Sequence, residues 1–99
     1  MSVAKVSEIS ATSPKSFEDA MQQAREIVRR LEPATAMGRF TVLGPAPAPL
    51  GRLRGEHRVQ FLLKGSRRSD MRNALMQVVA DMPEIRRRLT IDVDPLSVL

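Results

Sequence analysis

The sequence contains no cysteine, tryptophan or tyrosine, and it has three phenylalanines among 99 residues. Without cysteine the chain can form neither disulfides nor thiolate metal sites. With so few aromatic rings, it offers almost nothing on which nucleic-acid bases could stack. No run approaches the ~20 apolar residues that cross a bilayer, and the N-terminus lacks the apolar segment of a signal peptide. We therefore expect a cytoplasmic domain without membrane contact, and nothing calls for a metal or cofactor.

Positive charge is concentrated in the middle of the chain. The net charge is +5, and residues 44–88 carry ten cations and four anions. Residues 89–99 contribute two anions and no cation. A basic surface favours an anionic partner, and nucleic acid is the commonest one. Charge alone leaves open the alternative of a solvated surface rich in arginine.

The pattern of apolar residues predicts four strands and two helices within a single domain spanning residues 1–99. A helix follows Ser13 and Pro14, and either Ser13 or Ser16 is suited to cap it. Its apolar stripe runs from Phe17 to Leu31, and Pro33 is expected to end it. A second helix begins at Ser66 or Ser69 and ends at Pro83. The expected strands are Val3–Ile9, a short one around Phe40 and Val42, His57–Lys64 and Leu89–Val93.

This order of elements, βαββαβ, is typical of the ferredoxin-like arrangement. We therefore predict the α+β class, with a four-stranded antiparallel sheet and both helices on one face. Alternation within the third strand places Val59, Phe61 and Leu63 on the face that meets the helices.

The segment Leu43–Gly65 combines stiffness with positive charge. Pro45, Pro47 and Pro49 alternate with small residues, and proline donates no hydrogen bond to a sheet ladder, so residues 44–51 are expected to form a stiff connector. Three arginines follow this run and could be held at fixed positions before an anion. They are Arg52, Arg54 and Arg58.

Two further arginines, Arg67 and Arg68, precede the second helix. Cations at a helix N-terminus oppose the helix dipole, so they do not serve the stability of that helix. A bound phosphate would account for them, and a solvated charged face is the alternative.

Other motifs are weaker. The octapeptide Arg54–Phe61 partly matches the central strand of the RNA-recognition motif, but Glu56 and Arg58 stand where stacking aromatics belong. Asp92 and Asp94 share one face of a strand and could serve as a metal or acid–base pair, although we expect them to lie opposite cations on adjacent strands. His57 has no recognisable catalytic partner, and the phosphate-loop and metalloprotease motifs are absent.

A large part of the chain resembles a known family. The segments GPAPAPL, RLRG and the terminal DVDP, together with AREIVRRLEPA, are similar to the C-terminal domain of the primosomal replication-restart DNA helicase, primosomal protein N′, from about Ala24 to Leu99. This resemblance implies a non-catalytic accessory module that helps its helicase to bind branched DNA and single-strand-binding protein. Carried over by position, it makes Arg52, Arg54 and Arg58 the cations nearest DNA.

Residues 3–24 instead resemble dodecin, a small flavin-binding protein with a twelve-subunit shell, through the segment SPKSFEDA. Dodecin's flavin site needs a tryptophan, which this chain lacks, so neither flavin binding nor the shell is expected. Two resemblances that meet near Met21–Arg25, within one helix and in register, suggest an engineered chimera. The segments would be residues 1–24 and 25–99.

The leading hypothesis from the sequence is therefore a designed, monomeric, non-enzymatic domain with no dedicated activity. The alternative is weak, salt-dependent binding of single-stranded or forked DNA through five arginines. They are Arg52, Arg54, Arg58, Arg67 and Arg68.

Overall fold

The computed structural model describes the backbone of residues 5–53 and 55–93, and the side chains of residues 5–48 and 55–91. Seven elements follow one another along these residues. They are β1 (Lys5–Ser13), α1 (Phe17–Ala36), β2 (Phe40–Leu53), β3 (Glu56–Gly65), α2 (Arg68–Ala80), α3 (Pro83–Arg86) and β4 (Leu89–Val93).

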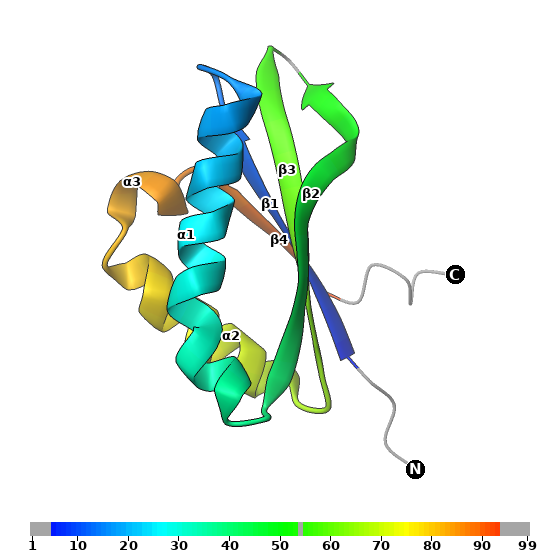
Figure 1. Ribbon diagram of the computed structural model, residues 1–99, viewed down its shortest axis with the longest axis vertical. Coiled ribbons are helices and arrows are strands. Elements are labelled where there is room, and N and C mark those ends of the chain that lie inside the picture. The colour runs from blue at the N-terminus through cyan, green and yellow to red at the C-terminus, as the bar shows by residue number, and fades with distance from the viewer. Residues whose placement is uncertain (1–4, 54, 94–99) are drawn as a thin grey trace.

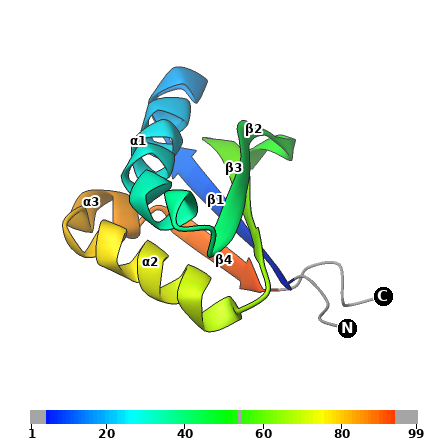
Figure 2. The same cartoon turned by 60° about the horizontal axis from the view of Figure 1, so that its bottom comes forward.

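The four strands form one antiparallel sheet in the order β2-β3-β1-β4. Helices α1 and α2 lie against the same face of this sheet and contact each other (Figures 1 and 2). The predicted ferredoxin-like α+β fold is thus confirmed, with the short helix α3 added between α2 and β4.

The hydrophobic core lies between the helices and the sheet. Strand residues Ile9, Phe61 and Leu63 meet helix residues Ile27 and Leu75 there, and all are at most 1% exposed. The predicted inward face of β3 and the predicted apolar stripe of α1 both contribute to this core. A single shared core is what stabilises two helices and a sheet that could not fold separately.

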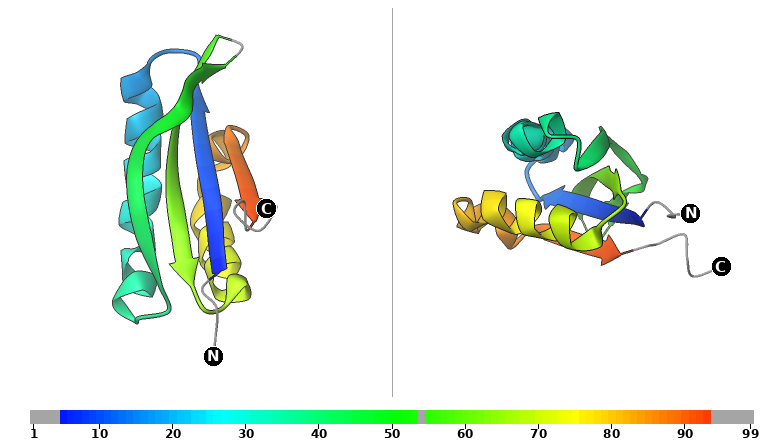
Figure 3. Two further views of the ribbon diagram at one scale, coloured as in Figure 1. Left: turned by 90° about the vertical axis from the view of Figure 1, so that its right-hand side faces the viewer. Right: turned by 90° about the horizontal axis from the view of Figure 1, so that it is seen from below.

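The opposite face of the sheet, which we call the open face, carries no helix formed by residues 5–53 and 55–93 (Figure 3, left). Strand alternation directs every second residue to it. In β1 these residues are Glu8, Ser10 and Thr12, and their partners in β3 are Leu62, Gln60 and Arg58. The open face is therefore mainly polar, in contrast to the apolar inner face.

Helix α1 begins and ends later than the proline positions suggest. Ser16 is its N-cap, and its Oγ accepts a hydrogen bond from the Asp19 backbone N–H at 3.0 Å. The expectation that Pro14 starts the helix is wrong, while the alternative Ser16 cap is confirmed. Pro33 lies inside the helix, which continues to Ala36. Pro33 has no N–H to donate to the Arg29 carbonyl four residues earlier. In the same last turn, the Thr35 hydroxyl donates to the Glu32 carbonyl at 2.9 Å.

The proline-rich segment is a strand, and the expectation of a stiff connector is wrong. Residues 44–51 belong to β2, with Ala46 opposite Gln60 and Pro47 opposite Val59. Prolines are tolerated because β2 is an edge strand with two register shifts, where missing donors interrupt no inner ladder. The edge strand also approaches β3 closely, since a Cβ on Gly44 would lie 3.1 Å from the Gln60 carbonyl oxygen.

The later elements differ from expectation mainly at their ends. The N-cap of α2 is Arg67, which makes no side-chain capping hydrogen bond, so neither Ser66 nor Ser69 caps this helix. Helix α2 ends at Ala80, and Pro83 starts α3 instead of stopping α2. Strand β1 extends to Ser13, four residues beyond its predicted end.

Candidate nucleic-acid interface

The described arginines among the five predicted to bind nucleic acid lie in two separate regions. Strand β3 runs from Glu56 to Gly65, with Arg58 near its start and Arg67 just beyond its end. At ~3.3 Å per residue, the strand separates these two positions by more than about 20 Å. The structure therefore does not bring Arg67 and Arg68 next to Arg58.

The first region is the β2–β3 hairpin. The backbone of Arg52 pairs with His57, one residue from Arg58, whereas Arg54 lies outside the described residues. Arg58 is half-buried on the open face, and its Nη2 donates to the Ser10 Oγ at 3.4 Å. Ser10 is only 1% exposed, so this contact holds the guanidinium against the sheet.

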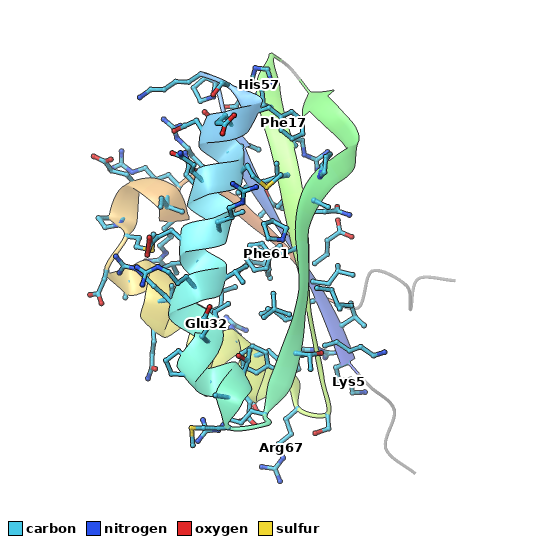
Figure 4. All side chains as sticks on the ribbon, in the orientation of Figure 1. Lys5, Phe17, Glu32, His57, Phe61 and Arg67 are labelled. Carbon is cyan, nitrogen blue, oxygen red and sulfur yellow. The ribbon has the colours of Figure 1, made fainter. Side chains whose placement is uncertain are left out.

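The second region is the end of the molecule where β3 meets α2. Register brings residues together here that are far apart in sequence, because Gly65 pairs with both Lys5 and Phe40. Lys5 and Arg67 extend from this lower end in Figure 4, whereas His57 and Phe17 lie at the opposite end. We call this the basic end and define it by six cations. They are Lys5, Arg39, Lys64, Arg67, Arg68 and Arg72.

Most cations of the basic end are available to a partner. Among the described side chains, the ion pairs join Glu26 of α1 to Arg29 and Arg30. Lys64 and Arg67 are exposed and make no ion pair with a described residue. Sequence reasoning missed Lys5 and Arg39 because only strand register places them near the start of α2. It also passed over Lys64, although this lysine stands three residues before Arg67 in the chain.

The start of α2 also carries uncapped backbone donors. The first N–H groups of any helix lack partners within the helix and give its N-terminus partial positive charge. Arg67 occupies the N-cap, where its side chain makes no capping hydrogen bond, and Asp70 is the acid of the first turn. Backbone and side chains at this end together favour an anion.

The start of α1 is satisfied by its own side chains. The Ser13 hydroxyl donates to Asp19 Oδ2 at 2.6 Å, and the Gln23 amide donates to the same oxygen at 3.0 Å. The Ser13 Oγ also accepts from the Lys15 backbone N–H at 3.1 Å. The hydrogen bond from Ser13 is the main reason that the pKa of Asp19 lies below its usual value. We call these residues the Asp19 network, and its role is structural.

The remaining candidates from the sequence are two aspartates and one histidine. Asp92 lies opposite Glu8 of β1, so the expectation that it faces a cation is wrong for that neighbour. Asp94 lies outside the described residues. His57 packs against Phe17, with ring centroids 6.2 Å apart. Within residues 5–53 and 55–93, no group of three potential metal ligands comes together.

One apolar cavity of about 270 Å³ lies between α2 and the inner face of the sheet. Ile9, Leu63 and Met71 contribute to its apolar lining, and Arg68 and Arg72 line it from α2. In the part of the chain that the structure describes, no helix is both long and apolar enough to span a membrane.

These features define a ferredoxin-like domain with a basic end and an open sheet face. The chain belongs to the family described as the primosomal protein N C-terminal domain, whose model matches residues 3–96. This match includes residues 3–24, so one family covers both sides of the proposed junction within α1, and a dodecin origin is not shown. No curated protein matches the chain.

Among solved structures, the chain is similar to one titled "De novo designed protein Foldit4". The TM-score is 0.55 with 11% sequence identity, over 92% of this chain and 93% of the other. Identity this low relates the two folds and nothing more.

Proposed function

We propose that this chain is a non-enzymatic accessory domain that binds nucleic acid, with single-stranded or forked DNA as its substrate class. Membership of the primosomal protein N C-terminal domain family supports this role. In the helicase that the sequence resembles, ATP hydrolysis belongs to other domains. The function of this domain would then be to hold DNA, which requires cations and no catalytic group.

The basic end is the observation that carries the proposal. Six cations from two strands, two loops and one helix gather around the N-terminus of α2. Gathering like charges destabilises a fold through their mutual repulsion, and a bound anion relieves that repulsion. A phosphate backbone supplies that anion in a repeating form that can meet several of these cations at once.

The expected binding is weak and strongly dependent on salt. Each phosphate contact on a single strand releases counterions and adds about 0.7 to the slope of log K against log salt concentration. Four to six contacts therefore predict a slope of roughly −3 to −4. A titration of the chain against a fluorescent single-stranded oligonucleotide at several salt concentrations measures this slope.

A matched pair of variants tests which cations are responsible. Replacing Arg39, Lys64 and Arg67 with glutamine removes three charges from the basic end. Replacing Arg25, Arg86 and Arg87 with glutamine removes three exposed charges from α1 and the α3 region. The proposal predicts that the first triple variant lowers the slope by about 2 and the control leaves it nearly unchanged. Equal losses in both would contradict a localised interface.

The hairpin arginines have their own test. If Arg52, Arg54 and Arg58 extend the interface, the double variant Arg52→Ala with Arg54→Ala lowers the slope by about 1 to 1.5. An unchanged slope would remove these two arginines from the interface and leave the basic end as the binding site.

The engineered chimera is the second hypothesis. The similarity of residues 3–24 to dodecin favours it, and so does the continuous buried stripe of Ala20, Ala24 and Ile27 through the supposed junction. It predicts a monomer with one cooperative unfolding transition and no salt-dependent DNA binding. Sedimentation would exclude it by revealing a twelve-subunit particle, and so would a salt slope near −3.

A further inference from the structure

We infer that the open face of the sheet selects unpaired over duplex nucleic acid through four alternate residues of β3 and one of β2. These residues, which we call the β3 strip, are Arg58, Gln60, Leu62 and Lys64, together with Leu43. The inference rests on the proposed function and assigns it a second contact surface, beyond the basic end.

Strand geometry aligns the strip. Its β3 members alternate with the core residues Val59, Phe61 and Leu63, so they project from the face opposite the helices. No helix covers this face in the described part of the chain (Figure 3, left). The strip therefore forms a row of exposed and partly exposed side chains along β3, which we call the track and which leads to the basic end.

Cations occupy both ends of the track. Lys64 is exposed at one end and belongs to the basic end. Arg58 lies at the other, and its hydrogen bond to the buried Ser10 fixes one guanidinium nitrogen while leaving further donors for a phosphate. Six residues of strand place their backbones about 20 Å apart. A phosphate backbone that follows β3 can reach both.

The centre of the track is apolar, which is unusual on a polar face. Leu43 is 52% exposed, and its register partner is the half-buried Leu62. The apolar faces of bases are accessible in an unpaired strand, whereas in a duplex they are stacked on one another. Paired leucines between two cations therefore fit an unpaired strand. Aliphatic contacts are weaker than aromatic stacking, which agrees with a weak binder.

An acidic residue confines the partner to one side of the face. Glu8 of β1 is partly exposed and is the register partner of Leu62. Its charge repels a phosphate backbone from the β1 side. The half of the open face formed by β2 and β3 is complementary to the phosphate backbone. One extended nucleic-acid strand fills that half.

The test compares an unpaired oligonucleotide with a duplex of the same length, using the full chain. The double variant Leu43→Ser with Leu62→Ser keeps the charge, and we expect it to weaken single-strand binding about fivefold without changing the salt slope or duplex binding. The variant Glu8→Gln is expected to strengthen single-strand binding by about two- to threefold. Thermal unfolding of each variant shows whether the fold is retained.

The outcomes separate the two proposals. Absence of any salt-dependent binding by the unchanged chain would refute the proposed function, and the strip with it. Salt-dependent binding that is equal for single strand and duplex, and insensitive to the leucine pair and to Glu8, would overturn the strip alone. If the leucine variant unfolds, Glu8→Gln still tests the β3 strip. Glu8 is a partly exposed residue outside the core, so its replacement is expected to leave the fold intact.

Discussion

The two strand-to-helix connections of this domain occupy equivalent places in the fold but carry side chains of opposite charge. The β1–α1 connection carries a serine N-cap, acids in the first helical turn and the Asp19 network. The β3–α2 connection carries Arg67 at the N-cap position, no side-chain cap, and further cations around it. The two connections lie at opposite ends of the molecule, because β1 and β3 are antiparallel (Figure 1).

This difference suits the first connection to stabilising the fold and the second to binding an anion. At the start of α1 the Ser16 hydroxyl accepts from one of the free N–H groups, and the acids of the first turn complement the helix dipole. Both stabilise the fold without a partner. Arginines at the start of α2 do neither. The second connection therefore leaves a stabilising interaction unmade within the protein and available to an anion from outside.

The largest expected effect on stability comes from replacing Asp19, the residue at the centre of the β1–α1 connection. In Asp19→Ala, the Ser13 hydroxyl and the Gln23 amide both lose their acceptor. Ser13 is fully buried, so we expect a loss of about 2 kcal/mol in the free energy of unfolding. Urea denaturation measures it. A loss below 0.5 kcal/mol would show that the Asp19 network does not stabilise the fold.

A smaller effect, with a dependence on pH, is expected for Ser13→Ala. The folded protein holds the pKa of Asp19 below its usual value, chiefly through Ser13. The stability that this contributes is complete above the unfolded-state pKa of about 3.9 and is lost as pH falls through the folded-state value. We expect a difference of about 1 kcal/mol from the unchanged chain at pH 7, which shrinks below about pH 4.

Denaturation series at pH 7 and at stepwise lower pH check this expectation. A difference between the two proteins that stays constant down to the most acidic condition would contradict the assignment to Asp19 ionisation.

The smallest effect on stability is expected at the second connection. Arg67 is exposed and makes no capping hydrogen bond, so Arg67→Ala should change the free energy of unfolding by less than about 0.5 kcal/mol. The same variant should weaken DNA binding and lower its salt slope by about 0.7. A stability loss equal to that of Ser13→Ala would remove the contrast between the connections.

The architecture could be predicted from the sequence because apolar periodicity reports which faces are buried. The stripe of α1 and the inward residues of β3 were correctly predicted on this basis, and the order of elements then left one common fold. Prolines were less informative. Pro33 lies inside α1, where it does not end the helix. Pro45 and Pro47 lie on an edge strand, a tertiary position that the sequence does not report.

The candidate site could be predicted only in part. Arg67 stands at a helix start in the sequence and in the structure, so local reasoning found it. Lys64 is near it in the chain, whereas Lys5 and Arg39 join it through strand register, which no local pattern specifies. The pairing of Asp92 with Glu8 is equally a consequence of register, and it reverses the expectation that an acid faces a cation.

The most direct test of the central claim is a paired measurement on Arg67→Asp. Aspartate is a favourable N-cap residue and complements the dipole, so it should raise the free energy of unfolding by about 0.5 to 1 kcal/mol. The same substitution places an anion where the account puts a phosphate. The account predicts a protein that melts at a higher temperature and binds single-stranded DNA more weakly. A variant that melts lower, or that binds DNA as well as the unchanged chain, would contradict it.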